Sequence, residues 1–355
     1  MTLALVAGPL LAEGLLRWLL FSPATLARRL GERYRQAGLY VASPFTDDFA
    51  KLSWRFQPAW LHPDRPMHYG DARTGWLKAT IDTATYRHAA EAELGSRRPV
   101  LLYGSSFAAC KPDARCFEEL LDDSELGRSL CLLNYAVQGH GLDQTLLLLE
   151  HSVDLYAERS PLVVVAFVVE ADLDRSTLSF FTRPKPRYRA DGDGTFRLEL
   201  PDELVARVYI ERHPPAITSY LWRYLVNGTE VALETRQRWE DEPSRVLDRD
   251  AINAFLLREL ARACTDRSLE HFVLLFHTRE AFATAPGRAE LVLRAELERL
   301  AVPHLDTREL VERARARRGS TLEDLYEPSG HPTALGTEVL FETLAAGLAG
   351  QRDGA

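Results

Sequence analysis

The chain has little cysteine and methionine for its length, with four Cys and two Met in 355 residues. No Cys or His arrangement has the spacing of a zinc site, and no Walker or dinucleotide-type glycine pattern occurs. The sequence therefore indicates no metal and no nucleotide cofactor. A formal net charge of −8 argues against nucleic acid as a main partner. Hydrophobic residues at 46% and charged residues at 26% are ordinary proportions for a folded, soluble domain.

The few cysteines leave two interpretations open. Cys110 and Cys116 flank a short loop, which a disulfide could close, and Cys131 with Cys264 would complete an even count of four. Such pairing is typical of an oxidising compartment. The alternative is four buried free thiols, which cytosolic proteins commonly contain.

The amino-terminal segment is almost wholly apolar from residue 2 to residue 21, interrupted by Glu13 and Arg17. A stretch of ~20 apolar residues has the length that crosses a bilayer core. The two charges and Pro9 count against a membrane span, and no basic stretch precedes the segment. We therefore expect residues 1–22 to form either a membrane anchor or an amphipathic helix that packs against the domain.

Beyond this segment, strand-like and helix-like patterns alternate along the chain. Alternation of this kind implies right-handed crossovers between parallel strands. It predicts an α/β fold: a three-layer α/β/α sandwich around a mostly parallel central sheet. The expected strands are 99–102, 130–137, 161–169, 271–276 and 302–306, and the expected helices are 142–156, 249–263, 289–300 and 337–348.

Two stretches fall outside the alternation. Residues 23–97 are rich in Trp, Pro and His and are expected to form an extension that packs on the domain. The domain itself would span 98–350, with an insertion at about 173–248. Asp191-Gly192-Asp193-Gly194 within this insertion predicts a hairpin turn. An insertion at this point could cover a pocket and choose the substrate.

Chemically informative residues occur at two strand or helix ends. Gly104-Ser105-Ser106-Phe107 follows an apolar strand, which places a serine hydroxyl at the carboxyl end of the sheet. His331 stands just before Pro332, at the start of the last helix. Together they suggest Ser106 as a nucleophile and His331 as its general base.

These motifs resemble those of the SGNH, or GDSL-type, hydrolases. Gly104-Ser105-Ser106-Phe107 is similar to the nucleophile motif Gly-Asp-Ser-Phe, 134–139 to the second block, and 331–336 to the last block. The resemblance covers about residues 98–349 and implies the flavodoxin-like sandwich of that family. It also implies an oxyanion hole made by the backbone N–H groups of Ser106 and Gly139.

The sequence departs from the family pattern at three positions. Ser105 replaces the motif aspartate, and Ala171 replaces the asparagine whose side chain would donate to the oxyanion. The acid partner of the histidine would fall on residues 328–329, which carry no carboxylate. Glu327, the tentative acid, or Asp324 could orient the imidazole instead, or the site could work as a Ser–His dyad.

The resemblance implies a serine esterase, acting on an ester such as an O-acetyl group of a cell-envelope glycan. An O-acyltransferase of the same fold and a catalytically inactive glycan- or partner-binding module are the alternatives. The expected partners are a small-molecule or glycan ester and, through residues 2–21, a membrane. No cofactor and no metal are expected. The expected location is the cell envelope, membrane-anchored or periplasmic, with the cytoplasm as the alternative.

Overall fold

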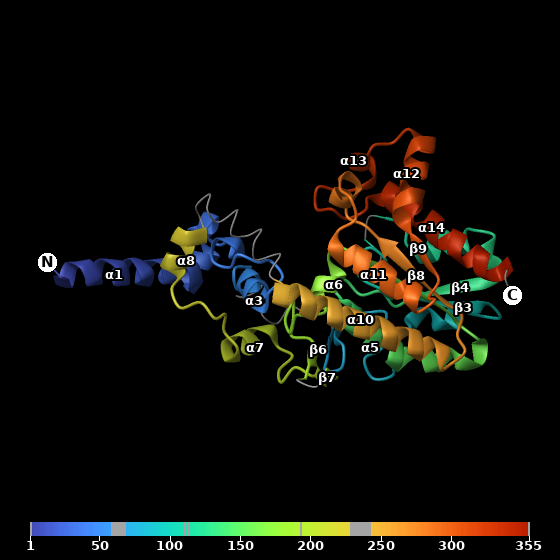
Figure 1. Ribbon diagram of the computed structural model, residues 1–355, viewed down its shortest axis with the longest axis horizontal. Coiled ribbons are helices and arrows are strands. Elements are labelled where there is room, and N and C mark those ends of the chain that lie inside the picture. Colours follow the sequence, from blue (N-terminus) through green and yellow to red (C-terminus); the bar gives the residue numbers. More distant parts are fainter. Residues whose placement is uncertain are drawn as a thin grey trace. The chain divides into compact units, whose positions relative to one another are not determined.

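The computed structural model describes residues 2–57, 69–109, 111, 114–191, 194–227 and 243–353. The chain divides into two compact units, and Figure 1 shows the order of their elements. The first, here the N-terminal unit, comprises residues 1–75, 178–185 and 200–248. The second, here the sheet unit, comprises 76–177, 186–199 and 249–355. The predicted insertion at 173–248 is thus divided between the two units.

The sheet unit is built on five parallel strands in the order β4-β3-β5-β8-β9. Their consecutive apolar residues are buried along almost the whole length of β3, β4, β5 and β8. Such runs form parallel strands because helices cover both faces of the sheet. The predicted parallel α/β sheet is confirmed. The strands are β3 (Arg98–Gly104), β4 (Leu130–Asn134), β5 (Leu162–Val168), β8 (His271–Phe276) and β9 (His304–Asp306).

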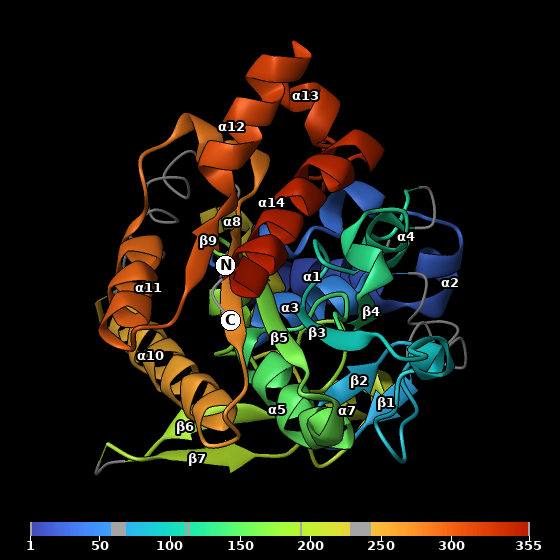
Figure 2. The same ribbon diagram turned by 90° about the vertical axis from the view of Figure 1, so that its right-hand side faces the viewer.

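Six longer helices flank this sheet: α4 (Phe117–Asp122), α5 (Leu142–Ser152), α10 (Pro243–Thr265), α11 (Arg288–Arg299), α12 (Thr307–Arg318) and α14 (Ala334–Asp353). Apolar side chains of α4, α12 and α14 share one core with the strands. The opposite face carries α5, with α10 and α11 beside it (Figure 2). Helices on both faces give the three layers that the sequence predicts.

Shorter elements complete the sheet unit. A hairpin forms at the predicted turn, from β6 (Arg187–Ala190) and β7 (Phe196–Glu199), which pair antiparallel. The unit also contains α6 (Asp172–Arg175), α13 (Leu322–Leu325) and most of β2 (Gly75–Leu77).

The strand order places a ligand-binding edge at the ends of β3 and β5. These strands are neighbours, but the connections that follow them run to opposite faces, and open α/β sheets bind ligands at such points. Gly104 ends β3 opposite Ala166 of β5. A Cβ atom on Gly104 would lie 2.2 Å from the backbone oxygen of Ala166, so glycine permits this close approach.

The N-terminal unit is mostly helical and contains α1 (Thr2–Phe21), α2 (Pro23–Ala27), α3 (Asp47–Arg55), β1 (Tyr69–Asp71), α7 (Ala206–Arg212) and α8 (Tyr220–Asn227). Leu20, Tyr40, Leu52 and Tyr220 belong to one of its two buried clusters among the described residues. The carboxylate of Asp47 accepts hydrogen bonds from the backbone N–H groups of Ser179 and Phe180, which ties 178–185 to α3.

The predicted helix near the amino terminus is α1. Among the described residues, no helix is both long enough and apolar enough to cross a membrane. The attachment of residues 2–21 to a membrane stays a prediction.

The cysteine pairing expected from the even count is wrong for one pair. Cys131 and Cys264 are buried and free. Burial is the main reason that the pKa of the Cys264 thiol is raised to about 12, which leaves it protonated and unreactive at neutral pH. Cys116 is disulfide-bonded, and Cys110 lies outside the described residues.

We expect the substitution Gly104→Ala to destabilise the sheet unit, because its Cβ would collide with the Ala166 backbone oxygen at 2.2 Å. The melting temperature should fall by about 4 °C or more. Gly350→Ala, on α14 where a Cβ meets nothing within 4 Å, is the matched control and should leave it nearly unchanged. Equal melting temperatures for the two variants, measured by circular dichroism, would contradict this account.

Candidate active site

The two residues singled out as nucleophile and base lie together. Ser106 follows β3, and His331 precedes α14 in a loop that pairs with the preceding segment, where the Glu327 N–H donates to the His331 oxygen. Ser106 Oγ lies 3.1 Å from His331 Nε2, within hydrogen-bond distance. Phe107 packs against the imidazole at 5.6 Å between ring centres, with the two rings tilted by 41°. The arrangement suits proton transfer from the serine to the histidine.

The nucleophile turn is attached to the neighbouring strand by a buried carboxylate. Asp172 is 1% exposed, and its Oδ2 accepts from Ser105 Oγ at 2.5 Å and from the Val168 N–H at 2.8 Å. Its Oδ1 accepts from Arg175 Nη1 at 2.5 Å. Burial raises the pKa of Asp172, while Arg175 and the hydrogen bonds oppose that effect. Ser105 thus fixes the turn by donating to an aspartate on another strand end.

A second loop at the same edge contains Gly139, the expected oxyanion donor. Gly139 is buried with φ of 85°, a left-handed conformation that favours glycine. Two residues earlier, the Val137 N–H donates to the Gly104 oxygen at 2.9 Å, which places this loop beside the end of β3. Trp76 also stabilises this loop, because its Nε1 donates to the Gln138 oxygen at 3.1 Å.

Asn134 connects this loop to the nucleophile turn. Its Nδ2 donates to the Ala108 oxygen at 2.9 Å, and its Oδ1 accepts from the Ala136 N–H at 3.0 Å. One buried amide at the end of β4 therefore fixes both segments from which backbone oxyanion donors are expected.

No carboxylate contacts His331 directly in the described part of the site. Its Nδ1 lies 3.4 Å from Ser329 Oγ, and this hydroxyl donates to Glu327 Oε2 at 3.0 Å. Glu327 is also paired with Lys111 Nζ at 2.9 Å. Glu327, the tentative acid, therefore reaches the imidazole only through Ser329. Asp324, the other candidate, accepts from the Thr321 N–H and hydroxyl at the start of α13.

The electrostatic surroundings keep the imidazole neutral. The pKa of His331 is lowered first by burial and then by the positive charges of Lys111 and Arg175, while Glu327 raises it. A neutral imidazole is the form that accepts a proton, so these groups suit His331 to work as a base near neutral pH.

The sequence motifs do not indicate a network of polar and charged side chains that the structure shows beside the site. His277 follows β8 and is fully buried, with Nδ1 2.8 Å from Glu170 Oε1 and Nε2 3.0 Å from Asp306 Oδ1. Glu170, His277 and Glu290 carry atoms within 4.8 Å of one another, a spacing that could hold a metal ion. However, Arg308 and Arg294 donate to the Glu290 carboxylate and already balance its charge. The sequence did contain a signal for this network, because a polar residue stands at or just after the end of three strands: Glu170 after β5, His277 after β8 and Asp306 in β9.

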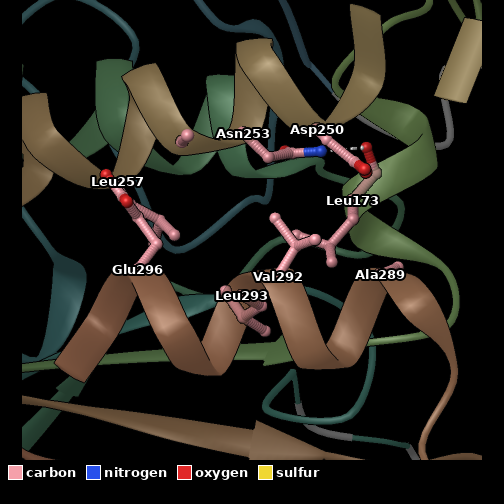
Figure 3. A pocket seen from close by; sticks show the side chains of 9 residues that line it. Leu173, Asp250, Asn253, Leu257, Ala289, Val292, Leu293 and Glu296 are labelled. Carbon is pink, nitrogen blue, oxygen red and sulfur yellow. Dashed lines mark hydrogen bonds between the residues drawn. The ribbon is translucent and has the colours of Figure 1, made fainter. Parts of the chain in front are cut away.

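A separate pocket lies between α10 and α11 and contains neither Ser106 nor His331 (Figure 3). Its cavity of about 10 Å³ is at the lower limit for one water molecule. It is therefore too small for an ester substrate. The lining residues include Leu173, Asn253, Leu257, Val292, Leu293 and Glu296.

Comparisons with known proteins give structural likeness at low sequence identity. No family model and no curated protein matches the chain. Protein YXIM from Bacillus subtilis is similar over 72% of this chain, with 10% identity and a TM-score of 0.41, but this chain spans only 57% of its length. A protein described as a GDSL-like lipase from Parabacteroides merdae has 12% identity over 71% of this chain and 97% of its own, with a TM-score of 0.37.

An acetylxylan esterase from Geobacillus stearothermophilus has 12% identity over 71% of this chain and 94% of its own, with a TM-score of 0.38. The similar structures thus include a GDSL-like lipase and an esterase, the class that the sequence motifs resemble. At these TM-scores the likenesses carry no argument, and the function rests on the geometry of the site itself.

We expect Lys111→Gln to raise the pKa of His331, because it removes a positive charge that lowers this pKa and leaves Glu327 unbalanced. The acidic limb of the pH profile of kcat/KM for a short acyl ester should move to higher pH by about 0.5–1 unit. The control is Arg115→Gln, whose residue pairs with Asp123 on the surface. An unchanged or lower midpoint for Lys111→Gln would contradict the charge effect.

Proposed function

We propose that the chain is a serine esterase in which Ser106 attacks the carbonyl carbon of an ester. The observation that carries this proposal is the 3.1 Å distance between Ser106 Oγ and His331 Nε2 at the carboxyl edge of a parallel sheet. A nucleophile within hydrogen-bond distance of a base is the arrangement required for covalent acyl transfer. Both residues come from regions that the sequence motifs indicate.

The proposed reaction proceeds in two steps. The Ser106 oxygen forms a bond to the acyl carbon as His331 Nε2 takes its proton, and the imidazolium then protonates the leaving alcohol. Water hydrolyses the resulting acyl-serine with His331 again as the base. Ser329 would orient Nδ1, with Glu327 stabilising the imidazolium through that hydroxyl.

Three groups are proposed to stabilise the oxyanion. Backbone N–H groups of Ser106 and Gly139 are two of them. The third is the guanidinium of Arg175, which would replace the side-chain donor absent at Ala171. Ala171 is the N-cap of α6, and Arg175 lies four residues later, where side chains lean back over the first turn. Arg175 is held by Asp172, so its guanidinium is fixed near the site.

The substrate class is proposed to be an acylated carbohydrate, such as an O-acetylated glycan of the cell envelope, with O-acyl transfer as the same chemistry using a sugar hydroxyl in place of water. A non-catalytic glycan-binding module is the competing function. The lack of a carboxylate contact on His331 among the described residues favours that alternative, whereas the pairing of Ser106 with His331 opposes it.

The proposal predicts that a fluorophosphonate probe labels Ser106 in the purified chain. Ser106→Ala should lose the adduct, and His331→Ala should slow labelling by roughly 10³-fold or more. Peptide mass spectrometry locates the adduct, and circular dichroism confirms that the variants fold. A folded parent protein without an adduct would move the assignment to a binding module.

Replacement of Arg175 should slow the acyl-transfer step. We expect Arg175→Gln to lower kcat for an acetyl ester by roughly 10²-fold, with KM nearly unchanged, because an oxyanion donor acts mainly in the transition state. Adding Ala171→Asn to this variant should recover part of the loss by supplying an amide donor.

Arg159→Gln is the matched control, because Arg159 lies on the surface of the same unit and donates to the Gly95 oxygen. A lower melting temperature for Arg175→Gln with an unchanged kcat would show that Arg175 only balances Asp172.

A further inference from the structure

The described residues with large exposed apolar side chains gather on two helices of the N-terminal unit. Seven of the eleven such side chains belong to α1 and α8. Six of them are 55–68% exposed, and we call this set the apolar tip: Leu10, Leu11, Leu15 and Trp18 of α1, and Trp222 and Leu225 of α8. Clustered exposure of this kind marks an interaction surface.

The tip faces away from the core of its unit. Leu20 is buried in the cluster that contains Tyr220, and Leu16 packs against that cluster. The helical repeat puts Leu11, Leu15 and Trp18 on the opposite side of α1. On α8, Tyr220 and Tyr224 turn inward, whereas Trp222 and Leu225 are exposed.

The two charged residues of α1, Glu13 and Arg17, both form hydrogen bonds to other groups of the N-terminal unit. Glu13 accepts from the N–H groups of Tyr220 and Leu221 at 3.0 and 2.8 Å, and so caps the start of α8. Arg17 pairs with Glu13 and donates to the Thr218 oxygen. Burial acts to raise the pKa of Glu13, but the hydrogen bonds together outweigh it and lower the pKa to about 2. Both charges that count against membrane contact in the sequence therefore have partners, Glu13 at the start of α8 and Arg17 at Glu13 and the segment just before α8.

Basic residues follow the apolar tip directly. Residues 25–35 contain four arginines and one glutamate. Arg28, Arg29 and Arg33 are exposed, and the structure pairs none of them with a carboxylate of a described residue. This segment packs on the last turn of α1, because Arg35 Nη2 donates to the Leu19 oxygen at 2.8 Å. A positive belt thus lies at the end of the apolar helix.

We propose that α1 and α8 dock together on the surface of a bilayer containing anionic lipids, with the apolar tip inserted among the acyl chains and Arg28, Arg29 and Arg33 at the headgroups. Tryptophan side chains favour the membrane interface, and arginines beside an apolar helix end bind acidic headgroups. The contact is shallow and does not require a helix that spans the bilayer.

Charge favours a membrane over a second copy of this chain. A symmetric dimer formed through the apolar tip pairs apolar side chains with one another and brings no carboxylate of the tip to Arg28, Arg29 and Arg33, whereas an acidic lipid surface neutralises them. A bilayer also adapts to apolar side chains on two helices at once, without needing a complementary shape.

The test is co-flotation of the full chain with vesicles. We expect binding to vesicles of phosphatidylcholine and phosphatidylglycerol, weaker binding to phosphatidylcholine alone, and weakening by salt. The double variant Leu11→Ser/Trp222→Ser should bind at least tenfold more weakly, since it removes roughly two buried apolar side chains. Replacing the three arginines by glutamine should reduce binding to the anionic vesicles only.

Leu291→Ser is the matched control, because Leu291 on α11 is 56% exposed and lies outside the tip. It should bind as the parent does, and circular dichroism should show every variant folded. Failure of the parent to float, or equal binding of the double variant, would overturn the proposal. A concentration-dependent dimer that the double variant abolishes, without flotation, would assign the surface to a second copy instead.

Discussion

The buried carboxylate of Asp172 is the interaction on which the site depends. It accepts from Ser105 beside the nucleophile, from the Val168 N–H at the end of β5, and from Arg175. A buried charge is costly unless hydrogen bonds and an opposite charge compensate it, so all three donors are needed together. The hydrogen bonds to this one carboxylate join the ends of β3 and β5 and fix the turn that presents Ser106. They also hold the guanidinium of Arg175 near His331.

Much of the sheet unit could be predicted because its signals are local. The run at β5 is apolar throughout, and the strand at 271–276 has the predicted bounds, since both strands are buried on two faces. The division into two units could not be read in the same way. Segments 178–185 and 200–248 join the amino terminus through contacts such as Asp47 with Ser179, which are distant in sequence.

The site was predictable only where a residue type and a strand or helix end coincide. Ser106 met both conditions, and His331 was marked by its place just before the last helix, whereas the partners that hold them depend on distances between separate elements. Ser105 looked like a loss of the motif aspartate, yet its hydroxyl donates to Asp172, the first residue of α6 after β5, at 2.5 Å. His277 is a single histidine after a buried strand, and only the fold shows that it lies between Glu170 and Asp306.

The charges around His331 set a balance between the two roles of the imidazole. Lys111 and Arg175 lower its pKa together with burial, which favours the neutral base that accepts the Ser106 proton. The same cations disfavour the imidazolium that forms in the proposed reaction, whereas Glu327 opposes them by its charge and, through Ser329, by a hydrogen bond. If Arg175 also contacts the oxyanion, its positive charge stabilises the oxyanion and destabilises the imidazolium of His331. Because the oxyanion and the imidazolium form together with equal and opposite charge, the net effect of Arg175 on acyl transfer depends on which of the two its guanidinium lies nearer.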